Sequence, residues 1–287
     1  GTGTHQLAVR SDVEDTPEVI EKYGDSFNPK RENWEEIRGD IEFKNLTFRY
    51  PDADYDSLSD ANFKISAGEN VGIIGKTGSG KTTIVDILLR IYNVPDEKVF
   101  IDGRDVNELT IHSLRQNMAY VPQDNFLFSD TIEHNIAFGL ENYDAEEVKR
   151  FAEMSDVHGN IAEFSEGYQT ILGERGVTVS GGQKQRISIA RALMKGASIL
   201  ILDDSVSAVD TETERTIINN LREARKGKTT ILIAHRVSTV EKMDKIIFVD
   251  DGKILAVGTH DELLTSSEEY RRTVELQKLD EEKGGAL

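Results

Sequence analysis

Two stretches of the sequence combine residue types that handle phosphate and metal chemistry. The first, "GKTGSGKTT" (75–83), has the spacing G-x-x-x-x-G-K-[ST], with an apolar stretch (71–74) before it and helical spacing after it. The second, "ILILDDSVSAVD" (199–210), runs four apolar residues into Asp203 and Asp204. A glycine-rich loop together with carboxylates at a strand end is the composition of a magnesium–nucleotide site.

The glycine-rich loop is predicted to bind the phosphates of a nucleotide. Backbone N–H groups of such a loop converge on phosphate oxygens, and the N-terminus of the following helix adds its positive end. Lys81 is expected to hold the β- and γ-phosphates, and the Thr82 hydroxyl to ligate Mg²⁺. Lys76 receives no side-chain role. The predicted binding stretch consists of Gly75, Lys76, Thr77, Gly78, Ser79, Gly80, Lys81, Thr82 and Thr83.

The first of the paired aspartates is predicted to bind the metal. "ILILD" reads as a buried strand that ends in Asp203, and in a parallel sheet this end lies at the same edge as the glycine-rich loop. A carboxylate there can bind Mg²⁺, usually through water. The alternative is an ordinary strand end followed by a turn, but the glycine-rich loop in the same chain favours the metal role.

A third motif, "VSGGQKQRISIARAL" (179–193), places a Ser-Gly-Gly turn at the start of a helix, which makes a second anion-binding helix end. Here the chain resembles the ATP-binding cassette (ABC) family, whose signature is LSGGQ; Val179 stands in the first place. The chain looks most like the nucleotide-binding domain of an exporter-type ABC transporter. The resemblance spans residues 40 to about 265, with the motifs in family order.

Several shorter matches accompany the signature. Tyr50 matches the aromatic residue that stacks on adenine, and Gln123 the glutamine that reaches Mg²⁺ and the attacking water. His235 matches the switch histidine near the γ-phosphate, and "SAVD", which ends in Asp210, the loop that crosses the dimer interface. Each match alone has an ordinary structural explanation, but their common order favours the family. Two further segments resemble exporter sequences: 125–139 and "GERG" at 173–176.

The resemblance implies ATP and Mg²⁺ as cofactors and a head-to-tail pair of domains. The signature of one domain would face the loop of the other across ATP, and closing and opening of the pair would move attached transmembrane domains at the cytoplasmic face of a membrane. The helical segment would carry the surface that touches those domains. The residues expected to reach the partner's ATP are Ser180, Gly181, Gly182, Gln183 and Asp210. The metal would be held by Thr82, Gln123 and Asp203.

The second aspartate departs from the family pattern. The family usually has Glu after the metal-binding Asp, where it orients or deprotonates the attacking water; Asp204 carries the same charge and is one methylene shorter. A misplacement of about 1 Å can cost on the order of a hundredfold in rate. We therefore expect nearly intact ATP binding and slow hydrolysis at this chain's own loop, with Asp204, Gln123 and His235 as the catalytic residues.

This departure resembles the slow site of heterodimeric ABC exporters. It favours a partner that is a different subunit and carries Glu after its metal-binding Asp. Two interpretations stay open, because a backbone shift could let Asp204 act as a base, and His235, which is often altered in slow sites, is unaltered here. A second possible function is a regulatory ATP-binding module with negligible turnover, which the hydrolysis rate would distinguish.

The order of predicted elements indicates an α/β fold. The strand at 40–50 is followed by two more strands around a turn at Ala67–Gly68, and helical segments dominate 124–179. After residue 180, helices and apolar strands alternate, which predicts a P-loop NTPase with a mainly parallel core sheet, an antiparallel β region and an inserted helical subdomain. The expected elements are helices 181–195 and 211–225 and strands 198–203, 229–234, 245–250 and 253–257.

The predicted domain limits follow from these elements. Residues 39–265 form the nucleotide-binding domain, whose core is 39–123 and 180–265 and whose helical subdomain is about 124–179. Residues 1–38, acidic and broken by prolines, are expected to be a linker from a preceding membrane domain, with a short helix around 17–23. Residues 266–287 form a charged tail, in which Ser266 and Glu269 suggest a capping box.

The composition excludes some functions. The 287 residues have a formal net charge of −18, which repels phosphate backbones and argues against a soluble ABC ATPase that acts on nucleic acid. The chain has no cysteine, so disulfides and thiolate metal sites are excluded. No apolar run approaches the ~18–20 residues that cross a bilayer, so any membrane-spanning part is expected elsewhere.

Overall fold

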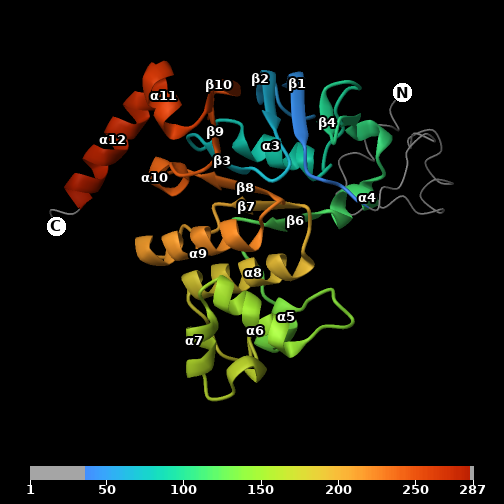
Figure 1. Ribbon diagram of the computed structural model, residues 1–287, viewed down its shortest axis with the longest axis vertical. Coiled ribbons are helices and arrows are strands. Elements are labelled where there is room, and N and C mark those ends of the chain that lie inside the picture. Colours follow the sequence, from blue (N-terminus) through green and yellow to red (C-terminus); the bar gives the residue numbers. More distant parts are fainter. Residues whose placement is uncertain (1–35, 285–287) are drawn as a thin grey trace. The chain divides into compact units, whose positions relative to one another are not determined.

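The computed structural model describes residues 36–284, which form two compact units (Figure 1). Unit 1 comprises 36–118 and 227–284, and unit 2 comprises 119–226. The predicted short helix at 17–23 and most of the predicted arm, 1–38, lie outside the described residues. The predicted limits of the core and of the helical subdomain remain predictions.

The N-terminal part of unit 1 is an antiparallel sheet, as predicted. Its strands follow the order β2-β1-β4-β5. On the buried face, Phe43 of β1 pairs with Phe63 of β2, and their stacked rings lie 4.4 Å apart between centroids. The strand bounds are β1 Ile41–Phe48, β2 Leu58–Ile65, β4 Val99–Ile101 and β5 Arg104–Asp105.

The remaining strands of unit 1 form the parallel core. β3 (Asn70–Ile74) pairs in parallel with β8 (Thr229–Ala234) on one side and with β9 (Lys245–Asp250) on the other. β10 (Lys253–Gly258) pairs antiparallel with β9. All six residues of β8 are buried, as expected for a strand covered on both faces. The predicted α/β class with a mainly parallel core sheet is therefore confirmed.

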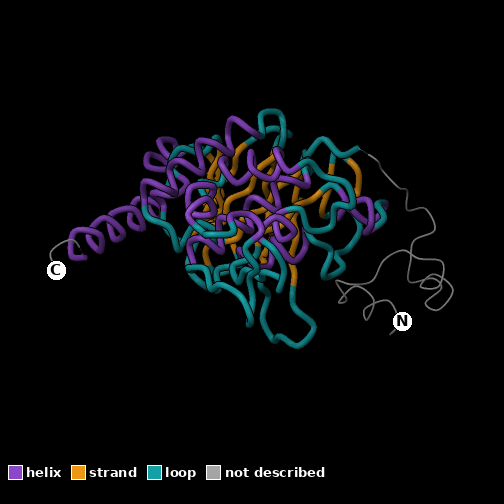
Figure 2. Tube along the Cα trace, turned by 90° about the horizontal axis from the view of Figure 1, so that it is seen from below, coloured by secondary structure: helices purple, strands orange, loops and turns teal. Residues whose placement is uncertain are grey.

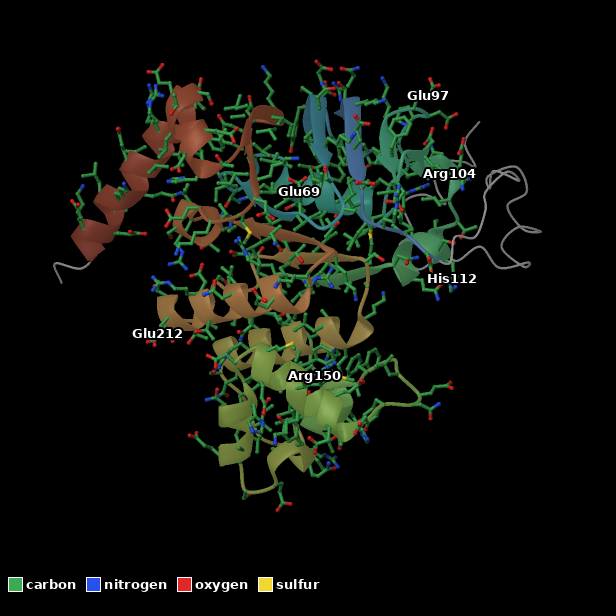
Figure 3. All side chains as sticks on the ribbon, in the orientation of Figure 1. Glu69, Glu97, Arg104, His112, Arg150 and Glu212 are labelled. Atoms are coloured by element: carbon green, nitrogen blue, oxygen red, sulfur yellow. The ribbon has the colours of Figure 1, made fainter. Side chains whose placement is uncertain are left out.

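The turn between β2 and β3 lies where the sequence predicted it. Gly68 has a φ of +88°, a backbone conformation that residues with a side chain rarely adopt. Glu69, labelled in Figure 3, accepts hydrogen bonds from the Ser66 amide at 2.6 Å and from Lys245 Nζ at 2.9 Å. One carboxylate thus ties the turn to the start of β9.

Helices complete unit 1. They are α3 Lys81–Leu88, η2 Val106–Glu108, α4 Ile111–Gln116, α10 Val237–Val240, α11 His260–Ser266 and α12 Glu268–Gly284. Figure 2 shows α12 as a straight helix that leads to the described C-terminus. The predicted capping box at Ser266 was wrong, because Ser266 ends α11. Ser267 caps α12 instead, its Oγ accepting from the Tyr270 amide at 3.2 Å.

Unit 2 carries the second half of the α/β pattern and the helical segment. β6 (Met118–Val121) and β7 (Ile199–Asp203) are neighbouring strands. α8 (Gly181–Lys195) and α9 (Thr211–Ala224) match the predicted helices, and α5 and α6 pack against α8 (Figure 1). The other elements are α5 Ile132–Ile136, α6 Ala145–Met154, α7 His158–Glu163 and η3 Gly167–Gln169. Among the helices of residues 36–284, none has the length and apolar character that crossing a membrane requires.

Candidate nucleotide-binding site

The glycine-rich loop connects β3 to α3 in unit 1, the strand–loop–helix setting that the sequence predicted. Gly75 must be glycine, because a Cβ there would lie 2.4 Å from the Val249 carbonyl oxygen and 2.6 Å from Ser79 Oγ. Gly78 and Gly80 have φ angles of +78° and +118°. The backbone therefore follows a path that only glycines allow without strain at these points.

The end of this loop suits an anion. Gly80 is the N-cap of α3 and offers no side chain to its first N–H groups. Ser79 Oγ is buried and has no hydrogen-bond partner among the described residues. Thr82 is exposed, which leaves its hydroxyl accessible. Uncapped amides and an unsatisfied hydroxyl at a helix N-terminus fit a phosphate group, so the loop fits the nucleotide that the sequence implies.

Lys81 and His235 come together in unit 1. Parallel pairing aligns Ile74 of β3 with Ala234 of β8, so the next residues, Gly75 and His235, leave the sheet at the same edge. Lys81 Nζ donates to the Gly75 carbonyl oxygen and lies 3.0 Å from His235 Nδ1. The residues predicted to meet the β- and γ-phosphates are therefore neighbours, although 154 positions separate them in the chain.

Tyr50 lies near the same helix. Its hydroxyl donates to Asp86 Oδ2 at 2.6 Å and contacts Thr83 Oγ1 at 3.1 Å. Burial raises the pKa of the Tyr50 phenol well above its ordinary value and also raises the pKa of Asp86. The ring packs edge-on against Phe48 and Tyr92. These contacts fix the ring that the resemblance assigns to adenine stacking, while Thr83 is buried and serves as a partner of Tyr50.

The paired aspartates end β7 in unit 2. Asp203 Oδ2 accepts from the Tyr120 hydroxyl at 3.2 Å, and Asp204 Oδ2 lies 3.4 Å from Gln123 Nε2. The structure thus brings together Gln123 and Asp204, two of the predicted catalytic residues. Asp204 has a left-handed φ of +52°, which aspartate tolerates better than most residues. The short side chain is therefore placed by a turn, directly after the buried strand.

The signature motif opens α8 at the surface of unit 2. Ser180 and Gly181 are exposed, and Ser180 forms a capping box with Gln183. Ser180 Oγ accepts from the Gln183 amide at 3.2 Å, and Gln183 Oε1 accepts from the Ser180 amide at 3.1 Å. A Cβ on Gly182 would lie 2.8 Å from the Ala208 carbonyl oxygen, so glycine is required for this close approach. The N-terminus of α8 is therefore capped by its own residues and accessible to solvent.

The loop between β7 and α9 is held by a residue that the sequence analysis missed. Gln185 Nε2 donates to Ser207 Oγ at 3.0 Å, and Gln185 Oε1 accepts from the Ala208 amide at 2.9 Å. Asp210 then caps α9, its carboxylate accepting from the Thr213 amide at 2.8 Å, and this bond lowers the pKa of Asp210. Gln185 lies one helical turn beyond the Ser-Gly-Gly turn, a spacing that could have marked it as a support.

Comparison with known proteins agrees with this geometry. The family described as "ABC transporter" matches residues 58–207, which include the glycine-rich loop, the signature and the paired aspartates. The chain belongs to the ABC transporter family. Its strand–loop–helix site and its signature helix are the features of an exporter-type ABC nucleotide-binding domain, as the sequence predicted.

Relatives of this ABC domain include flippases and a solved exporter. The ATP-dependent lipid A-core flippase of Escherichia coli (strain K12) is 44% identical over 244 residues, which are 85% of this chain and 42% of the flippase. The flippase of Shigella flexneri gives the same values. A bacterial Atm1-family ABC exporter solved with ATP bound is 39% identical, with a TM-score of 0.82 over 88% of this chain and 44% of that one. The chain thus spans less than half the length of these relatives.

Proposed function

We propose that the chain binds and hydrolyses ATP as the motor domain of an ABC exporter, at the cytoplasmic face of a membrane. The observation that carries this proposal is the cluster of Lys81, His235 and the uncapped N-terminus of α3 at one sheet edge. A cation, a histidine and a helix N-terminus without a side-chain cap, all close together, suit the phosphate end of a nucleoside triphosphate. Bound Mg²⁺ would neutralise phosphate charge, with Thr82, Gln123 and Asp203 as its proposed ligands.

The exposed N-terminus of the signature helix α8 supports a head-to-tail pair of domains. Ser180 and Gly181 present the positive end of α8 to solvent, so a phosphate of ATP bound by another domain can reach it. In such a pair, Gly182, Gln183 and Asp210 line or support the same surface. Binding of ATP would then close the pair, and loss of the γ-phosphate would open it, which moves attached transmembrane domains.

The slow-site proposal rests on Asp204. Its carboxylate follows β7 directly and lies within reach of Gln123, but it is one methylene shorter than the Glu that the family usually has. We propose that this chain's own loop forms a slow site and that its intact signature completes a faster site on a partner that carries Glu. The alternative remains a regulatory module that holds ATP with negligible turnover.

An ATPase assay of the chain alone, and then mixed with candidate partner domains, tests these proposals. We expect slow hydrolysis by the chain alone and a clear increase with a partner that supplies Glu. Hydrolysis that stays negligible with every partner would support the regulatory module instead. Fast hydrolysis by the chain alone would contradict the slow site and would show that Asp204 acts as a competent base.

Ser180→Arg should reduce turnover at the partner's loop and leave ATP binding at this chain's own loop unchanged. The arginine side chain would fill the space in front of the α8 N-terminus, where the partner's phosphate is expected. Turnover in the mixed assay and nucleotide binding by the chain alone separate the two effects. Lys184→Arg, one turn further along α8, is a matched control. A fall in the chain's own ATP affinity with Ser180→Arg would contradict the assignment across the pair.

An exposed aromatic cluster in unit 2 supports contact with transmembrane domains. Phe126 and Phe138 are 65% and 56% exposed, and the Phe138 ring stacks on Phe128 at 4.1 Å. Arg191 holds this cluster, since its Nε donates to the Asn135 carbonyl oxygen at 2.7 Å and its guanidinium lies 5.4 Å from the Phe128 ring centre. Burying such rings against a partner is favourable, at about 25 cal/mol per Å² of apolar area.

Phe138→Ser should weaken association with the transmembrane domains of the full transporter without changing ATP affinity. The change removes the exposed ring that stacks on Phe128, so less apolar surface is buried in the contact. Co-purification of the domains and nucleotide binding by the chain measure the two quantities. Leu255→Ser is the control, because Leu255 is an exposed apolar residue on β10 of unit 1. Unchanged co-purification would remove the aromatic cluster from the interface.

A further inference from the structure

A residue of the C-terminal helix α12 forms hydrogen bonds to the segment that contains His235. Gln277 Oε1 accepts from the Val237 amide at 2.8 Å, and Gln277 Nε2 donates to the His235 carbonyl oxygen at 2.8 Å. One side-chain amide therefore holds both ends of the three-residue stretch from His235 to Val237. Val237 is the first residue of α10, whose N-cap, Arg236, provides no side-chain cap. Gln277 takes that place from another helix.

The buried face of α12 holds Gln277 in place for these hydrogen bonds. Tyr270, Val274 and Gln277 are spaced by four and three residues, so they lie on one face of the helix. Tyr270 is fully buried; its hydroxyl lies 2.6 Å from His260 Nδ1, and its ring packs edge-on against Phe248 of β9. These contacts of Tyr270 fix the position of α12, and therefore of Gln277, relative to the segment from His235 to Val237.

The space beside Gln277 is not filled by packing. A cavity of about 380 Å³ is lined by the glycine-rich loop, by His235 and by residues of α12 that include Arg272, Leu276 and Gln277. Because this space is open, close packing of side chains does not immobilise the His235 segment on that side. The hydrogen bond from Gln277 to the His235 carbonyl oxygen therefore restrains the backbone of a residue that faces this space.

We propose that Gln277 is a positioning residue that holds the His235 ring toward Lys81 and the γ-phosphate. The inference rests on the proposed nucleotide function, since it concerns how His235 meets ATP. His235 Nδ1 lies 3.0 Å from Lys81 Nζ, and the backbone that sets this ring is the one that Gln277 holds. The helix α12 thus acts on the phosphate site through the histidine, without touching the nucleotide.

The test compares binding of MgATP and MgADP, because only ATP has a γ-phosphate. Gln277→Leu keeps much of the side-chain volume and removes both hydrogen bonds. We expect the affinity for MgATP to fall about three- to tenfold, the range that the loss of one or two hydrogen bonds produces, with MgADP unchanged. Lys278→Ala, an exposed neighbour on α12, is the control and should change neither affinity.

A double-mutant cycle with His235→Ala decides whether Gln277 acts through the histidine. If it does, Gln277→Leu should cause no further loss in the His235→Ala background, because contacts that work as a unit are not additive. Additive losses, or equal losses for MgATP and MgADP, would overturn the proposal. Unmodified chain that binds neither nucleotide would instead count against the proposed function itself.

Gln277→Glu provides a second variant if the leucine variant unfolds. Its carboxylate can still accept from the Val237 amide but cannot donate to the His235 carbonyl oxygen. We expect an intact melting temperature, slow hydrogen exchange at the Val237 amide and a loss of MgATP affinity smaller than that of the leucine variant. MgATP affinity equal to that of the unmodified chain would show that the bond to His235 has no positioning role.

Discussion

Replacing Lys81 with alanine should lower the affinity of the chain for ATP by about a hundredfold, because hydrogen bonds to charged groups contribute roughly 1.5–3 kcal/mol each. Lys81 is the first residue of α3, lies 3.0 Å from His235 Nδ1 and is only 6% exposed. Its ammonium group is therefore held beside Gly75 and His235, where the phosphates of ATP are expected. Calorimetric titration with MgATP measures the loss.

Two controls accompany this measurement. Lys253→Ala removes an exposed lysine of β10 in the same unit and should leave ATP affinity unchanged. Lys81→Met keeps an unbranched apolar stem without the charge, so it should bind ATP as poorly as the alanine variant while it preserves packing. Melting temperatures of all variants report folding. Unchanged ATP affinity in a folded Lys81→Met variant would contradict the phosphate role of this loop.

Replacing Asp204 with glutamate should raise the ATPase rate at this chain's own loop by about ten- to a hundredfold. The extra methylene lets the carboxylate extend as far as the Glu that the family usually has at this position. General-base catalysis raises a reaction rate by about 10²–10⁴-fold. The backbone at Asp204 has a φ of +52°, so glutamate meets a small conformational cost there. Because of this cost, we expect a rate increase near the lower end of the range that general-base catalysis gives. The rate is measured in the dimer whose slow site contains this loop.

Asp204→Asn separates charge from length. Asparagine has the size of aspartate and no negative charge, so it should lower the residual rate while it leaves MgATP binding nearly intact. A rate that rises with glutamate and falls with asparagine would assign the slow site to the missing methylene. A flat rate in both variants would place the limiting step elsewhere, because neither the charge nor the reach of residue 204 would then matter.

Local patterns predicted the elements well where a single helix or strand decides the outcome. The helix at 181–195 and the strand at 229–234 have the predicted bounds, because buried strands read as continuous apolar runs and caps mark helix starts. The capping residue of α12 was placed one position early, because a second helix, α11, ends at Ser266 and two adjacent serines compete for the cap. Sequence spacing alone does not resolve such a choice.

The sequence by itself determined the chemistry: a glycine loop with Lys81, a strand that ends in Asp203 and Asp204, and a Ser-Gly-Gly helix tip. Each depends on residues within one turn or strand end. Only the tertiary structure decided which distant groups meet. Strand register brings His235 to Lys81 across 154 positions, and helix packing brings Gln277 to the His235 backbone across 42. The physical reason is that such contacts depend on the register of strand pairing and on which helix faces are buried. The spacing of residues within one short stretch of sequence does not specify either of these.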